Sequence, residues 1–74
     1  MIDIKIIENE FYNNTGKNFK EVDMMMLNVT KVLMIFELIN IIENFHKKII
    51  SIEEIKEIKD FSCCNIVYSL SGDS

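Results

Sequence analysis

The sequence contains no arginine, a single histidine and only two cysteines, and these shortages exclude several kinds of site. Its basic residues are eight lysines against twelve acidic residues, which leaves a net charge of −4. Phosphate backbones are bound by basic surfaces, so we expect no nucleic-acid partner. One histidine and one cysteine pair, Cys63 and Cys64, supply too few of the usual ligands for a structural zinc site. No metal is therefore expected.

The two cysteines are neighbours, and adjacent cysteines reach disulfide geometry only with strain. We therefore expect two small buried thiols in a reducing compartment. The main apolar stretch, residues 32–42, is interrupted by Glu37 and Asn40 and is far shorter than the ~20 residues that span a bilayer. Acids within the first ten residues and the lack of a small-residue cleavage site argue against a signal peptide. These features predict a cytoplasmic protein with no membrane partner.

Enzymatic machinery is also missing. The sequence places no candidate nucleophile or orienting acid beside His46, and it contains no glycine-rich phosphate-binding loop. We therefore expect that the chain is not an enzyme.

What the sequence does contain is apolar residues, which make up 49% of its 74 residues. That fraction is typical of a folded chain, and the length suits one domain over residues 1–74. Apolar side chains repeat at intervals of three and four, which predicts helices over residues 3–12, 29–45, 52–59 and 63–70. The predicted fold is all-α.

The start of the chain has an alternative, because Ile2, Ile4 and Ile6 also alternate as they would in a strand. No hairpin partner follows, so the helix is favoured. Asn13 to Gly16 should end this helix, and a long loop is expected over residues 16–26. Phe19 and Val22 are expected to anchor that loop against the helices.

Capping residues indicate where the later helices begin. Asn28 or Thr30 can cap the helix predicted at residues 29–45, and Ser51 with Glu54 forms a capping box before the third helix. The core stripe of the long helix is predicted to be Met34, Ile35, Leu38, Ile41, Ile42 and Phe45. This assignment leaves Leu33, Phe36 and Ile39 partly off the stripe.

The segment L-N-V-T-K-V at residues 27–32 resembles the L-G-x-D-S-L motif that opens the second helix of acyl and peptidyl carrier proteins. Without a gap, Thr30 takes the place of the aspartate and Lys31 that of the serine. The resemblance covers residues 3–70. It implies a small four-helix bundle of acyl-carrier-protein type, with a long loop between the first two helices and a short third helix.

In the carrier family that serine carries the 4'-phosphopantetheine arm, and an amine cannot replace its hydroxyl in a phosphodiester. The resemblance therefore implies no cofactor, and Lys31 should be a solvated lysine at the start of the helix. It implies a docking or regulatory partner in fatty acid, polyketide or nonribosomal peptide biosynthesis, which binds biosynthetic enzymes or another carrier protein. Carriers dock through this helix, so the expected partner-binding residues are Lys31, Leu33, Phe36, Glu37 and Asn40.

Two alternatives remain open. The chain is a working acyl or peptidyl carrier if 4'-phosphopantetheine is attached at another residue. Thr30 has a hydroxyl, but one residue along a helix rotates a side chain by about 100°. Residues 71–74, S-G-D-S, look like a carrier motif but are expected to be a frayed tail. The other alternative is an unrelated helical module that forms a homodimer through the helix at residues 29–45.

Overall fold

The computed structural model describes residues 4–58 and 60–70, and every regular element among them is a helix. The all-α prediction is therefore confirmed, but these residues form five helices where four were predicted. The helices are α1 (Ile4–Thr15), α2 (Phe19–Asp23), α3 (Val29–His46), α4 (Ile52–Lys56) and α5 (Cys63–Leu70).

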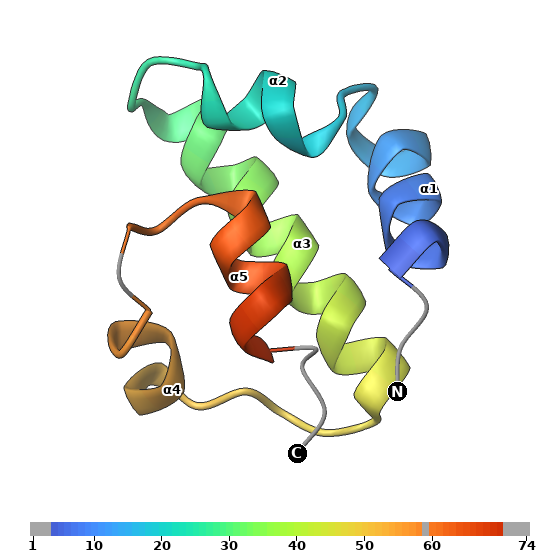
Figure 1. Cartoon of the computed structure of the whole chain (residues 1–74), viewed down its shortest axis with the longest axis vertical. Coiled ribbons are helices and arrows are strands. Elements are labelled where there is room, and N and C mark those ends of the chain that lie inside the picture. The colour runs from blue at the N-terminus through green and yellow to red at the C-terminus, as the bar shows by residue number, and fades with distance from the viewer. Residues whose placement is uncertain (1–3, 59, 71–74) are drawn as a thin grey trace.

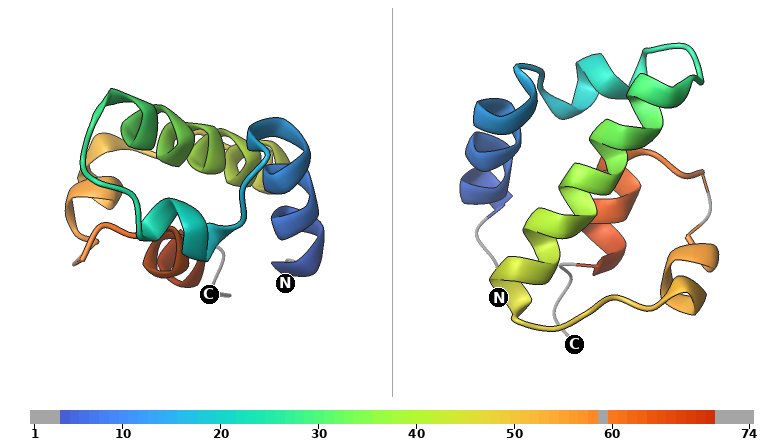
Figure 2. Two further views of the ribbon diagram at one scale, coloured as in Figure 1. Left: turned by 90° about the horizontal axis from the view of Figure 1, so that it is seen from above. Right: turned by 180° about the vertical axis from the view of Figure 1, so that it is seen from behind.

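The longest helix, α3, lies at the centre of the arrangement (Figure 1). Helix α1 packs beside α3 and runs in the opposite direction, whereas α5 packs beside α3 and runs in the same direction. The short α2 contacts both α3 and α5 near the start of α3. Helix α4 lies on the side of α5 that faces away from α1, level with the ends of α3 and α5, and an extended connection joins it to α3 (Figure 2). The core therefore lies between α1, α2, α3 and α5.

One cluster of buried apolar side chains holds these four helices together. Ile7 and Phe11 lie one turn apart on α1 and are completely buried. The Phe11 ring meets the ring of Phe19 on α2 at 5.1 Å between centroids, in a tilted arrangement. The remaining buried members are Val22, Ile35, Leu38, Ile39, Ile41, Ile42, Ile50, Cys63, Ile66 and Val67.

Helix α1 continues three residues beyond its predicted end. The hydroxyl of Thr15 donates to the carbonyl of Phe11 at 2.8 Å, so Thr15 stays within the last helical turn. Gly16 then adopts φ of 77°, and its N–H donates to the carbonyl of Tyr12 at 2.7 Å. This left-handed glycine ends the helix, as glycine commonly does. Ile4 and Ile6 are both helical, so the strand alternative is wrong for the described part of that segment.

Helix α2 lies inside the segment predicted to be a loop. The Asn18 side chain accepts from the backbone N–H of Glu21 at 2.8 Å, and the Glu21 carboxylate accepts from the N–H of Asn18 at 2.9 Å. This reciprocal pair is a capping box, and it begins a helix that the apolar spacing alone did not reveal. The predicted anchoring role is confirmed, because Phe19 and Val22 are both buried.

Helix α3 begins as predicted, because the Asn28 side chain caps it by accepting from the N–H of Lys31 at 2.9 Å. Thr30 is not the cap and lies inside the helix. Two assignments along α3 were wrong. Phe45, predicted in the core stripe, is 41% exposed, whereas Ile39, placed off the stripe, is buried. Three helices pack against α3, so its buried face is wider than one stripe.

The capping box at Ser51 and Glu54 is confirmed. The hydrogen bond from the backbone N–H of Ser51 lowers the pKa of the Glu54 carboxyl. Helix α4 ends at Lys56, before the predicted end at Lys59, which lies outside the described residues. Helix α5 has its predicted bounds, and the tail predicted at residues 71–74 also lies outside the described residues. No helix in the described ranges combines the length and the apolar character that crossing a bilayer requires.

Candidate functional site

The outer face of α3, defined here as Val29, Leu33, Phe36 and Asn40, carries large apolar side chains in contact with solvent. The exposed fractions are 72% for Val29, 60% for Leu33 and 53% for Phe36. These positions follow one another at intervals of three and four, so they share one side of the helix. The preceding loop adds the exposed residues Met24, Met26 and Leu27. Exposed apolar side chains that share one side of a helix are typical of interaction surfaces.

Lys31 does not belong to this outer face. Its side chain is half-buried, and its ammonium group donates to the backbone carbonyls of Asp23 at 3.2 Å and Met25 at 3.0 Å. The expectation of a solvated lysine was therefore wrong. Because the last carbonyls of a helix lack intrahelical partners, a cation beside them is favourable. Lys31 thus stabilises the end of α2 and the loop that leads into α3.

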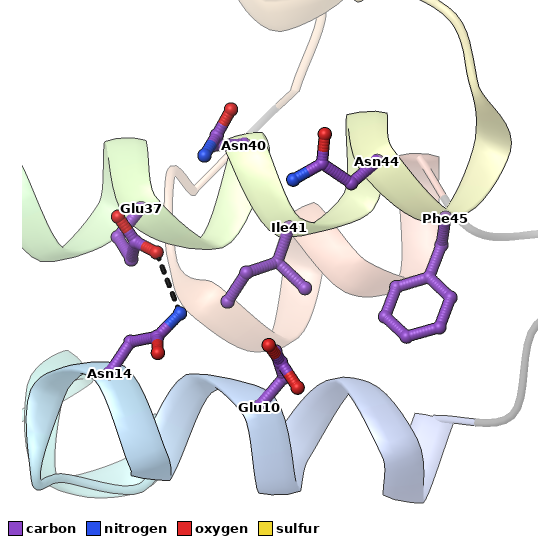
Figure 3. A pocket seen from close by; sticks show the side chains of 7 residues that line it. All are labelled: Glu10, Asn14, Glu37, Asn40, Ile41, Asn44 and Phe45. Carbon is purple, nitrogen blue, oxygen red and sulfur yellow. Dashed lines mark hydrogen bonds between the residues drawn. The ribbon is translucent and has the colours of Figure 1, made fainter.

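Glu37 points to a third side of α3, toward α1. Its carboxylate accepts a hydrogen bond from the side-chain amide of Asn14 at 2.9 Å (Figure 3). This bond crosses a groove between α1 and α3, which we call the α1–α3 groove. Figure 3 shows Glu10, Ile41 and Phe45 directed into the space between the two helices. The hollow in this part of the groove is lined by Glu10, Asn14, Glu37, Asn40, Ile41, Asn44 and Phe45.

A second hollow lies on the other side of the Asn14–Glu37 bond. It shares Asn14 and Glu37 with the first hollow and is otherwise lined by Thr15, Thr30, Leu33 and Met34. Thr30 is exposed in the first turn of α3, so its hydroxyl reaches solvent. The α1–α3 groove therefore consists of two adjoining hollows with one hydrogen bond between them.

The five residues predicted to bind a partner thus point in three directions. Phe36 lies on the outer face, Glu37 faces α1, and Lys31 contacts the end of α2. Leu33 and Asn40 lie between the first two directions, because they belong to the outer face and also line the hollows beside Glu37. The sequence prediction omitted Val29, although it lies four residues before Leu33 and the helical period could have indicated it. It also omitted Glu10 and Asn14, which no local pattern connects with α3.

The cysteines lie at the start of α5, where Asp23 binds the helix end. Backbone N–H groups of Cys63 and Cys64 donate to the two Asp23 carboxylate oxygens at 2.7 and 3.5 Å. Burial, followed by the charge of Asp23, raises the pKa of the Cys63 thiol to about 12. The same causes raise the pKa of Cys64, which is exposed, so its predicted burial was wrong. Thiols with raised pKa values are poor nucleophiles at neutral pH.

In the described part of the chain, no group of three or more His, Cys, Asp or Glu side chains is placed to hold a metal ion. Comparison with protein-family models, curated proteins and solved structures finds no match to this chain.

Proposed function

We propose that this chain is a carrier-like protein without a prosthetic group, which acts by contact as a docking or regulatory partner in fatty acid, polyketide or nonribosomal peptide biosynthesis. The observation that carries the proposal is the position of Lys31 and the hydrogen bonds of its side chain. Lys31 occupies the serine position of the resembling motif, and its amine is committed to two backbone carbonyls. Such a side chain has no hydroxyl for a phosphopantetheine arm and supports the fold instead.

The order of the helices supports the carrier-type reading of the fold. In this interpretation α1, α3, α4 and α5 correspond to the four helices of the carrier fold, and α2 lies within the long connection between the first and second of these helices. Position 31 then falls in the first turn of the second long helix, where the family places its serine. The proposed partners are biosynthetic enzymes or another carrier protein, in the cytoplasm.

The proposed contact surface is the outer face of α3. Removing a large apolar side chain from water contributes about 1.5–3 kcal/mol when it becomes fully buried. Val29, Leu33 and Phe36 are only partly covered in the isolated chain, so a partner can recover much of that free energy. Asn40 lies at the end of this apolar series and can form hydrogen bonds at its edge.

The absence of a prosthetic group can be tested by incubating the protein with coenzyme A and a phosphopantetheinyl transferase, with a working acyl carrier protein as the positive control. We expect the wild-type mass to stay unchanged, because the only hydroxyl in the first turn of α3, that of Thr30, lies one position away from the modified place. A mass increase equal to the arm would contradict the proposal. Loss of that increase in Thr30→Val would then identify Thr30 as the attachment residue.

A homodimeric module is the second candidate function, and the exposed outer face of α3 favours it. A stable dimer usually buries about 800 Å² per subunit, which three or four side chains on one face of a single helix do not supply. We therefore expect a monomer in size-exclusion chromatography with light scattering, for wild type and for Phe36→Glu alike. A wild-type dimer that Phe36→Glu dissociates would support the module instead. Tyr68→Glu, an 81% exposed site on α5, is the matched control.

A further inference from the structure

The two hollows of the α1–α3 groove differ in chemistry. The hollow nearer the start of α3 is formed by Leu33 and Met34 with hydroxyl groups around them, and Glu37 is its only ionisable residue. The other hollow has the buried Ile41 as its floor and Phe45 at its side, and it contains the carboxylates of Glu10 and Glu37. No lysine lines either hollow. The first hollow therefore suits an apolar side chain and the second suits a basic one.

The second hollow has the features that bind a lysine or arginine side chain. The aliphatic part of such a side chain packs on apolar surface while its charged end stays near polar groups. Phe45 offers a partly exposed ring, and a cation near an aromatic face is attracted by it. Glu10 lies across the groove on α1, so a cation between the helices would have a carboxylate on each side.

The spacing of the hollows indicates which kind of backbone could fill both. The α3 residues that line them are centred about seven to eight residues apart, which corresponds to about 11–12 Å along a helix. A partner helix presents residues i and i+7 on one side, about 10.5 Å apart. In an extended strand, side chains on one side recur at about 7 and 13 Å. No strand occurs in the described ranges to pair with an extended segment, so a helix fits better.

We propose that the α1–α3 groove binds an amphipathic helix of a partner protein, in which a large apolar side chain and a lysine or arginine are seven residues apart. The apolar side chain enters the hollow of Leu33 and Met34, and the basic one lies between Glu10 and Glu37. Small residues at the intervening positions pass over the Asn14–Glu37 bond. This inference rests on the proposed contact function and names the chemistry of the partner.

The test uses a synthetic alanine- and glutamine-based helical peptide of about 16 residues, which carries one leucine and, seven residues later, one arginine. Binding is followed by amide chemical shifts of the whole chain labelled with nitrogen-15. One control peptide replaces the arginine by glutamine. Another places the leucine and arginine five residues apart, which turns them about 140° away from each other.

We expect the peptide with seven-residue spacing to change the amide chemical shifts of residues that line both hollows, and to bind more tightly than either control peptide. Glu10→Gln and Glu37→Gln should each weaken binding about two- to fivefold, the range for partly exposed ion pairs. Glu53→Gln, an exposed acid on α4, should leave binding unchanged. Three outcomes would overturn the proposal. They are equal binding of all three peptides, amide chemical-shift changes that are spread over the helices and not confined to the groove, and no chemical-shift changes at all.

This experiment is independent of the transferase test. Failure of the peptide to bind, together with an unmodified wild-type mass, would remove the groove as a binding site and leave the outer face of α3 as the contact surface. A mass increase in the transferase test together with specific peptide binding would contradict the proposed function but support the α1–α3 groove as a binding site.

Discussion

Phe11→Ala is expected to lower the free energy of unfolding by about 3–5 kcal/mol, the usual cost of removing a buried phenylalanine side chain. Phe11 is completely buried, and its ring packs against Phe19, so the substitution removes contacts that α1 makes with α2 and the core. A chain of 74 residues is typically stable by only about 4–11 kcal/mol. Urea unfolding followed by circular dichroism at 222 nm measures the change, and the unfolding midpoint should move to a much lower urea concentration.

The matched control is Tyr12→Ala, which removes the neighbouring aromatic residue. Tyr12 is 56% exposed, so its substitution should change stability far less than that of Phe11. Similar losses for the two variants would mean that α1 does not pack on the core through the face described. Helix α1 has only 12 residues, and isolated helices of this length are marginal in water, so its helicity depends on that packing.

Asp23→Ala is expected to cost about 1.5–3 kcal/mol, the range for a hydrogen bond to a charged group. The Asp23 carboxylate accepts from the N–H groups at the start of α5, although 40 residues separate Asp23 from Cys63. Its negative charge also interacts favourably with the helix N-terminus. Denaturant unfolding measures the loss of stability. Faster hydrogen exchange of the Cys63 and Cys64 amides would place the loss at α5.

Asp23→Asn separates the two contributions of this side chain. The amide oxygen can still accept the hydrogen bond from Cys63, but the charge is lost, so the cost should be clearly smaller than for alanine. Equal losses in the two variants would indicate that the charge supplies nearly all the stabilisation. An Asp23→Ala variant as stable as wild type would contradict the role of Asp23 in joining α2 to α5.

The helices could largely be predicted because their signals are local. Asn28 and Ser51 cap the helices that follow them, and apolar side chains recur with the helical period in α1, α3 and α5. Helix α2 was missed although its signal was also local. Asn18 and Glu21 have the same spacing as Ser51 and Glu54, so the rule that located α4 could have located α2 as well.

The candidate site was less predictable because it depends on which helix lies beside each side of α3. Helical spacing groups Leu33, Phe36 and Asn40, and the structure places all three on the outer face. The same spacing does not show that Lys31 reaches the carbonyls that end α2, or that Glu37 meets Asn14. Both bonds join residues of different elements.

By itself the sequence determined the helical class of this protein, the start of α3 and the amine at position 31, because composition, caps and spacing act within a few residues. Only the tertiary structure decided that this amine supports the α2–α3 connection, that Phe45 lines a groove, and that Asp23 caps α5. These outcomes depend on the relative positions of helices distant in sequence. Such positions follow from packing the whole core, which no local pattern records.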